Sequence, residues 1–250
     1  MKKIISQIPN FITSLNMVSG LAAVVFAING QLVWAGTFIC LAAVFDFLDG
    51  FSARLLKAYS EIGKQLDSLA DMVSFGVAPG AILFTLLKFS MFEINRPVYE
   101  ISANWYEWPV LFSAFLIPVF GAIRLARFNV APAESTFFRG LPIPANGIFW
   151  ASLGLMTGNV EYNQVFFGTI FPVKNLVFFG VFISAMMVSN LPMFSLKFKT
   201  MGLKDNWFRY LFIVMALGLI LFFKFFGLAL CIFTYIFLNT LFYFFKVKYK

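Results

Sequence analysis

Histidine is absent from the sequence, and cysteine and charged residues are scarce. Without imidazole, Ser-His-Asp triads, histidine general bases and histidine-based zinc sites are excluded. The two cysteines, Cys40 and Cys231, both lie inside apolar stretches, which favours small core residues over a disulfide. Charged residues are 12% of the chain, whereas soluble domains carry about 25%. Apolar residues are 61% and include 36 phenylalanines, more than a core of this size can hide from water. The composition therefore excludes a soluble protein and predicts one that sits in lipid.

Long apolar stretches divide the chain into membrane spans, each needing roughly 20 mainly apolar residues. They predict eight transmembrane helices, over residues 11–29, 32–53, 64–88, 108–124, 143–158, 175–193, 208–223 and 226–245. The first stretch has no small-residue cleavage site, so we expect a span rather than a removed signal peptide. No segment is polar enough for a separate soluble domain. We therefore expect residues 1–250 to form a single all-α membrane bundle, whose last two spans lie within 194–250.

Basic residues are distributed unequally between the loops of this arrangement. Fifteen of the 19 lysines and arginines fall on one side of the eight spans, together with both ends of the chain. The positive-inside rule then predicts cytoplasmic N- and C-termini in a multi-pass protein of the cell membrane. The net charge of +8 fits contact with anionic lipid headgroups better than nucleic-acid binding.

Four aspartates interrupt the second and third predicted spans: Asp46, Asp49, Asp67 and Asp71. A carboxylate within a span costs a few kcal/mol and usually marks a functional site. The first two are spaced i,i+3 and the last two i,i+4, so each pair lies on one helix face. A turn near residue 58 brings all four to a similar depth in an antiparallel helix pair.

Converging carboxylates in a low dielectric need positive charge nearby. Mg²⁺ or Mn²⁺ would supply it, and four carboxylates suit two ions that share ligands, as in enzymes acting at phosphorus. A cation transporter with an acidic binding site is the alternative. Small residues beside the acids, Gly50, Ala53 and Gly63, indicate either close helix packing or room for a bulky ligand. Arg54 would offer a fork-shaped cation to a phosphate.

The spacing of these residues resembles the signature of the CDP-alcohol phosphotransferases. Its eight fixed positions all match across residues 46–71: Asp46, Asp49, Gly50, Ala53, Arg54, Gly63, Asp67 and Asp71. The resemblance implies a membrane enzyme that moves a phosphatidyl group from a CDP-linked lipid to an alcohol and releases CMP. It implies that Asp46 and Asp67 bridge two Mg²⁺ or Mn²⁺ ions and that Asp49 and Asp71 complete the two sites. It also assigns Asp71 as the base that takes the acceptor proton, with the site opening to the cytoplasm.

The same resemblance places further residues around the CDP-lipid. Gly50 and Ala53 would leave room for cytidine, Arg54 would contact the phosphates, and Gly63 belongs to the same pocket. Ser60 matches a position that touches the nucleotide. Asn10 and Thr13, in PNFIT, lie where the family's first helix enters the nucleotide pocket, although Asn10 is equally well explained as a helix N-cap.

Segments outside the signature resemble bacterial and archaeal phosphatidylserine synthases of the membrane type. They are SFGVAP at 74–79, RLARFN at 124–129, FRGLPIPA at 138–145 and MVSN at 187–190. This resemblance implies CDP-diacylglycerol and L-serine as substrates, with glycerol phosphate, inositol phosphate or an amino alcohol as alternative acceptors. Arg124, Arg127 and Asn129 could hold the acceptor or the lipid phosphate, or could be ordinary cytoplasmic-side residues. Small-residue helix faces are also compatible with a homodimer.

Overall fold

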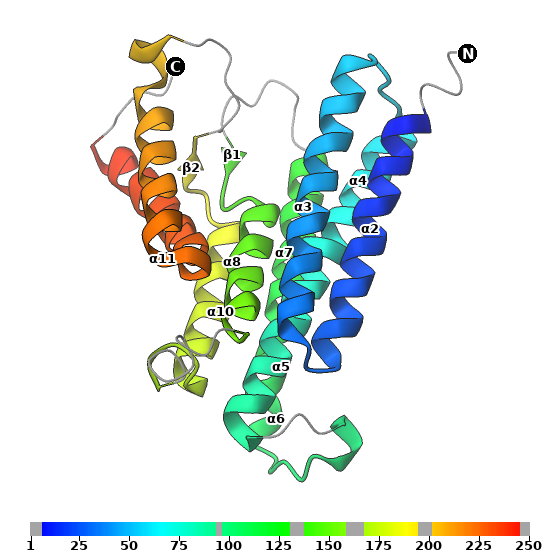
Figure 1. The fold of residues 1–250 in the computed structure, drawn as a ribbon, viewed down its shortest axis with the longest axis vertical. Helices are drawn as coiled ribbons and strands as arrows, with labels where there is room; N and C mark the ends of the chain where they lie inside the picture. Colours follow the sequence, from blue (N-terminus) through cyan, green and yellow to red (C-terminus); the bar gives the residue numbers. More distant parts are fainter. Residues whose placement is uncertain (1–6, 94–96, 131–137, 159–167, 195–201, 246–250) are drawn as a thin grey trace.

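Helices account for most of the computed structural model, which describes residues 7–93, 97–130, 138–158, 168–194 and 202–245 (Figure 1). The longer helices are α2 (Gln7–Ile28), α3 (Leu32–Leu55), α4 (Glu61–Met72), α5 (Ala78–Phe92), α7 (Leu116–Val130), α8 (Ile143–Met156), α10 (Val173–Val188) and α11 (Leu203–Phe244). Short helical segments are η1 (Val73–Val77), η2 (Val98–Glu100), α6 (Glu107–Phe112) and η3 (Ser113–Phe115). Strands β1 (Phe138–Arg139) and β2 (Pro192–Met193) pair antiparallel, with Phe138 opposite Met193.

Among the described residues, five helical segments are long and apolar enough to cross a membrane: Gln7–Ile28, Leu32–Leu55, Glu61–Phe92, Glu107–Val130 and Asn206–Phe244. The expectation of an all-α membrane fold is therefore confirmed. The predicted number of eight spans is not, because α8 and α10 have only 14 and 16 residues. The last two predicted spans lie within α11, which breaks at Lys224 (φ 48°, ψ −124°) and folds back on itself in Figure 1.

The second and third predicted spans meet at a short turn, as the sequence indicates. Helix α3 ends at Leu55 and α4 begins at Glu61. Lys57 takes a left-handed conformation with φ of 50°, which reverses the chain direction. Ser60 is the N-cap of α4, where its hydroxyl oxygen accepts the backbone N–H of Gly63 at 3.0 Å. The two aspartate pairs therefore lie on antiparallel helices at one end of the bundle.

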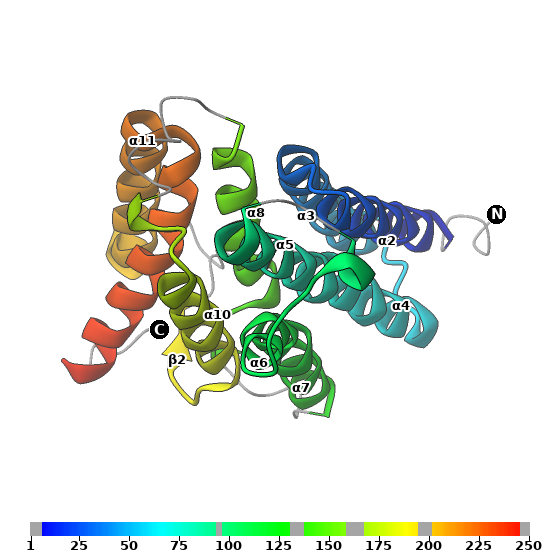
Figure 2. The ribbon, with the colours of Figure 1, turned by 90° about the horizontal axis from the view of Figure 1, so that it is seen from below.

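Helix α8 lies in the middle of the bundle, beside α3, α5 and α11 (Figure 2). Most of its residues are buried, including Phe149 and Trp150. Its contact with α3 is close because a Cβ on Gly36 would lie 2.6 Å from the carbonyl oxygen of Ala151. Small residues at such crossings let membrane helices approach each other, since lipid supplies no hydrophobic drive between helices.

Candidate active site

Three carboxylates converge where α3 and α4 face each other. Asp46 and Asp49 come from α3 and Asp67 from α4, and one carboxylate oxygen of each lies within 4.8 Å of the others. Asp49 is 5% exposed, and the other two are half-buried. The i,i+3 spacing on α3 and the position of the turn produce this meeting point, which holds three of the four aspartates predicted to converge.

Asp71 lies beside this cluster, one helical turn further along α4. It interacts electrostatically with Asp46, with Asp67 and with the guanidinium of Arg124 from α7. Its Oδ1 is buried without a hydrogen-bond partner in the described part of the chain. Asp71 thus stands between the acidic cluster and a cation.

The cluster has the chemistry of a site for divalent cations. Carboxylate oxygens are the ligands that Mg²⁺ and Mn²⁺ prefer, and three of them already converge. Asp49 Oδ2 is, like Asp71 Oδ1, buried without a hydrogen-bond partner among the described residues. Buried oxygens of like-charged groups are costly unless a cation neutralises them. The residues therefore fit a metal site.

Helix α2 forms a second wall of the site. The Thr13 side chain interacts with the Asp49 carboxylate, while its hydroxyl also donates to the Pro9 carbonyl at 2.9 Å. Asn10 approaches α4, because a Cβ on Gly63 would lie 2.8 Å from Asn10 Oδ1. Asn10 is inside α2, which already includes Gln7, so the interpretation of Asn10 as an N-cap is wrong.

The small residues of the signature differ in their surroundings. A Cβ on Gly50 would meet nothing within 4 Å, so this position borders open space. A Cβ on Gly63 would instead come within 2.9 Å of Ser60 Oγ, which indicates close packing. Ala53 is half-buried, and Arg54 is exposed in the last turn of α3. Room for a ligand is therefore found at Gly50 and not at Gly63.

The three polar residues of RLARFN point to different places. Arg124 faces Asp71, and its Nε is buried without a hydrogen-bond partner in the described residues. Arg127 is exposed and donates to the Val188 carbonyl at the end of α10, at 3.0 Å. Asn129 Nδ2 donates to Ser68 Oγ of α4 at 2.9 Å. Of the three, only Arg124 has an electrostatic interaction with an acidic residue of the site within the described part of the chain.

Sequence reasoning missed two polar residues near this site. Asn16 is fully buried one turn after Thr13 on α2, and neither polar atom of its amide has a partner among the described residues. Tyr235 of α11 lies near Arg124 and donates its hydroxyl to the Phe194 carbonyl at 2.7 Å. A polar amide within an apolar helix was the available signal for Asn16. Nothing local in the sequence connects Tyr235 with residue 124.

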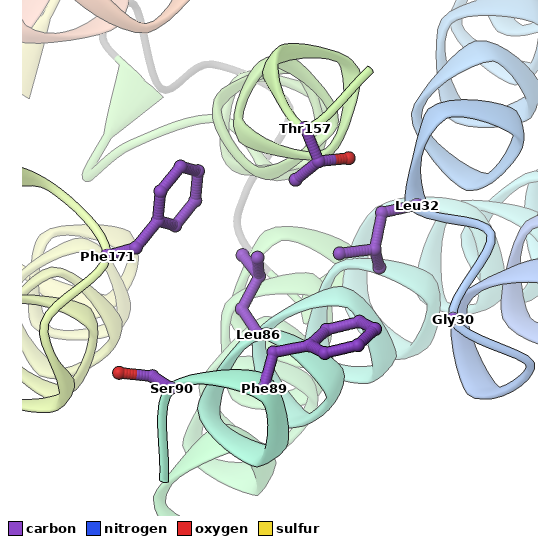
Figure 3. A pocket seen from close by; sticks show the side chains of 7 residues that line it. All are labelled: Gly30, Leu32, Leu86, Phe89, Ser90, Thr157 and Phe171. Carbon is purple, nitrogen blue, oxygen red and sulfur yellow. The ribbon is translucent and has the colours of Figure 1, made fainter. Parts of the chain in front are cut away.

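A cavity of about 440 Å³ lies beside the connection of α2 to α3, at the other end of α3 from the α3–α4 turn. Figure 3 shows the residues around it. It is bordered by Gly30, Leu32, Leu86, Phe89, Ser90, Thr157 and Phe171. Apart from the hydroxyls of Ser90 and Thr157, these side chains are apolar, and none carries a charge. A path for ions through a membrane needs polar or charged groups, so this cavity gives no support to a cation transporter.

The family model described as CDP-alcohol phosphatidyltransferase matches residues 6–243. The chain therefore belongs to the CDP-alcohol phosphatidyltransferase family. This match agrees with the signature at 46–71 and with the acidic cluster that the signature forms in three dimensions.

Relatives from three organisms share the name CDP-diacylglycerol–serine O-phosphatidyltransferase. The chain is 32% identical to the one from Mycobacterium bovis over 74% of its own length and 60% of the relative's. It is 31% identical to one from Helicobacter pylori over 73% of this chain and 70% of that protein. Identity to the Saccharomyces cerevisiae protein is 38%, over 54% of this chain and 49% of that one. The matched region thus spans about 60% of the mycobacterial relative and half of the yeast one.

We predict that neutralising Asp49 weakens divalent metal binding. Asp49→Asn removes the most buried of the three converging negative charges. Changing a residue that only supports a metal ligand already lowers metal affinity by about 10-fold or more, so Mn²⁺ affinity should fall by at least that much here. Electron paramagnetic resonance of free Mn²⁺ measures this without an activity assay. Glu61→Gln is the matched control, because Glu61 is exposed in the first turn of α4. Equal Mn²⁺ affinity in the two variants would contradict the metal site.

Proposed function

We propose that the protein transfers the phosphatidyl group of CDP-diacylglycerol to the hydroxyl of L-serine, which gives phosphatidylserine and CMP. The observation that carries this proposal is the position of Asp71, between the acidic cluster and Arg124. A base beside a metal site suits displacement at phosphorus, and a cation beside that base suits an acceptor that carries a carboxylate. The names of the bacterial and yeast relatives support the same acceptor.

The CDP-lipid would bind at the cytoplasmic end of α2, α3 and α4. Two Mg²⁺ or Mn²⁺ ions would be held by Asp46, Asp49, Asp67 and Asp71, where they would stabilise the charge that develops on the diphosphate. The open space at Gly50 would take the cytidine, beside half-buried Ala53 and Asn10 and above the buried Thr13. Arg54, one turn beyond Gly50, would contact the phosphates. Ser60 and Gly63 would shape the start of α4 beneath them.

The reaction forms one bond and breaks one at the β-phosphorus of CDP-diacylglycerol. The serine oxygen attacks this phosphorus, and the bond to the oxygen of CMP breaks. The serine hydroxyl is a weak nucleophile at neutral pH and must lose its proton to a neighbouring base. Asp71 takes that proton at Oδ1, which is buried beside the other acids and has no hydrogen-bond partner among the described residues.

Arg124 would select the acceptor by binding the serine carboxylate. Its guanidinium is half-buried, has an Nε without a partner among the described residues, and lies beside the proposed base. Charge-assisted pairs between arginine and a carboxylate are strong and directional. The carboxylate of serine lies a few bonds from its hydroxyl. By holding the carboxylate, Arg124 can therefore orient the hydroxyl oxygen toward Asp71.

We predict that purified protein releases CMP from CDP-diacylglycerol when serine and Mg²⁺ or Mn²⁺ are present, and that EDTA abolishes the release. Ethanolamine is the sharpest comparison, because it equals serine without the carboxylate, and serine should be preferred. Arg124→Gln should lower kcat/KM for serine by at least about 10-fold more than kcat/KM for ethanolamine, because only serine loses a charge-assisted contact. Loss of the positive charge beside Asp71 should affect both acceptors alike. Faster CMP release with glycerol phosphate or inositol phosphate than with serine would show that serine is not the acceptor. An unchanged ratio of serine to ethanolamine in Arg124→Gln would remove the role of Arg124.

A second prediction separates the base from the metal ligands. Asp71→Asn keeps the side-chain shape but removes the proton acceptor, so kcat should fall by about 10²–10⁴-fold. Binding of CDP-diacylglycerol, measured at saturating Mn²⁺, should weaken far less. Asp46→Asn should impair both quantities, since Asp46 lies in the cluster of three and beside Asp71. Near-normal kcat in Asp71→Asn would show that Asp71 is not the base.

The orientation in the cell membrane is proposed from the charge of the loops. The α3–α4 turn and the η2 segment lie at opposite ends of the bundle in Figure 1. In this arrangement both termini are cytoplasmic and the chain spans the membrane eight times. Helices α8 and α10 and the two halves of α11 would be the last four spans. The α3–α4 turn then faces the cytoplasm. The homodimer stays a prediction.

We predict that cysteines placed at two exposed positions react from opposite sides in right-side-out vesicles. In a background of Cys40→Ala and Cys231→Ala, a cysteine at Glu100 should react with an impermeant thiol reagent directly. A cysteine at Lys57 should react only after the membrane is opened. Labelling of both positions from the same side would contradict the proposed arrangement.

A further inference from the structure

A π-helical turn lies directly after the end of α4, close to Asp71. Segment η1, Val73–Val77, joins α4 to α5, and the N–H of Ala78 donates to the carbonyl of Val73, five residues back. A π turn inserts one residue into a helix and so rotates the next helical segment by about 100° relative to a continuous α-helix. Helix α4 before the turn presents the acids to the site, whereas α5 after it is buried along most of its length. The turn therefore determines the direction of Asp71 relative to the fixed core.

Three helices approach this turn through glycine residues. A Cβ on Gly20 of α2 would lie 2.7 Å from Ser74 Cα, and one on Gly147 of α8 would lie 2.5 Å from Phe75 Cδ1. A Cβ on Gly121 of α7 would lie 3.9 Å from Gly76 Cα. The first two approaches leave no space for a side chain. The turn is thus held between α2, α7 and α8.

Two hydrogen bonds from side chains complete its attachment. Asn146 of α8 donates from Nδ2 to the Phe75 carbonyl at 2.6 Å, and Ser74 donates from Oγ to the Asn16 carbonyl at 3.0 Å. Asn146 is fully buried among apolar side chains. A backbone carbonyl in such surroundings strongly favours a donor, because no water is available to replace it.

We propose that Asn146 is a positioning residue for the reaction, which acts by holding the Phe75 carbonyl and thereby fixing the π turn that directs Asp71. The inference rests on the proposed function, in which Asp71 is the base. Asp71 is two residues from the turn, while Asp67 is a full helical turn further away and Asp46 and Asp49 are on α3. Loosening the turn should therefore misplace the base more than the site that binds the CDP-lipid.

Asn146→Leu tests this, because leucine has nearly the same size and shape but no donor. The kcat for serine-dependent CMP release should fall by at least about 10-fold, since a displacement of about 1 Å can cost about 10²-fold in rate. The dissociation constant of CDP-diacylglycerol at saturating Mn²⁺ should change little. This split between turnover and binding is not expected from general loss of folding.

Asn239→Leu is the matched control. Asn239 of α11 is also fully buried and pairs with backbone, accepting from the Phe194 N–H at 2.8 Å and donating to the Tyr235 carbonyl at 2.7 Å. Its loss should lower thermal stability. Any loss of kcat in this variant should be matched by a similar loss of CDP-diacylglycerol binding. If Asn146→Leu does not fold, the milder variants Asn146→Ser and Ser74→Ala replace it, with Asn239→Ser as their control. They should show a smaller loss of kcat, again with little change in CDP-diacylglycerol binding.

Two results would overturn the inference. One is an unchanged kcat in the folded Asn146 variants, and the other is a parallel loss of kcat and CDP-lipid binding like that of the Asn239 variants. Both presuppose that the wild-type protein releases CMP with serine. Absence of that release would instead contradict the proposed function, so the two failures are distinguishable.

Discussion

Carboxylates crowded together in an apolar bundle are the constraint on which this structure depends. Each would cost a few kcal/mol in a membrane helix, and mutual repulsion adds to the cost when oxygens of three lie within 4.8 Å. Such a cluster persists only where cations and a rigid scaffold compensate for it. The short α3–α4 turn, the α2 wall at Thr13 and the guanidinium of Arg124 all serve this requirement. The fold around the acids is thus organised by electrostatics more than by apolar burial.

Glycines provide the rigidity, and their positions distinguish packing from binding. A Cβ on Gly20 would lie 2.7 Å from Ser74 Cα, and one on Gly36 would lie 2.6 Å from the Ala151 carbonyl oxygen, so the helices touch there through their backbones. A Cβ on Gly147 would lie 2.5 Å from the Phe75 ring, so this glycine makes room for that side chain. Membrane helices gain little from hydrophobic association, and close backbone contact replaces it. Gly50 is different because nothing lies within 4 Å of its missing side chain. The same residue type therefore closes the bundle at most crossings and opens it beside the acids.

The acidic cluster could be predicted from the sequence because helical periodicity alone places Asp46, Asp49 and Asp67 on facing surfaces. The all-α membrane fold followed from composition in the same way. The π turn could not be predicted, since it depends on glycines from three helices that are distant in sequence. The electrostatic interaction of Arg124 with Asp71 could not be predicted either, because it requires the register of α7 against α4. The start of α2 before Asn10 was missed because PNFIT is also compatible with a helix that begins at Asn10.

The arrangement also explains why the signature does not specify the acceptor. All eight signature residues lie on α3, α4 and the edge of their turn, whose task in the proposed reaction is to hold the CDP-lipid. The groups that approach Asp71 from the other side come from α7, and the π turn below it is held by α8. Residues of α7 that face Asp71 belong to neither of the helices that carry the carboxylates, so they can change while α3 and α4 stay the same. A family built in this way can keep one chemistry for the CDP-lipid and change its acceptor by altering the residues that face the base.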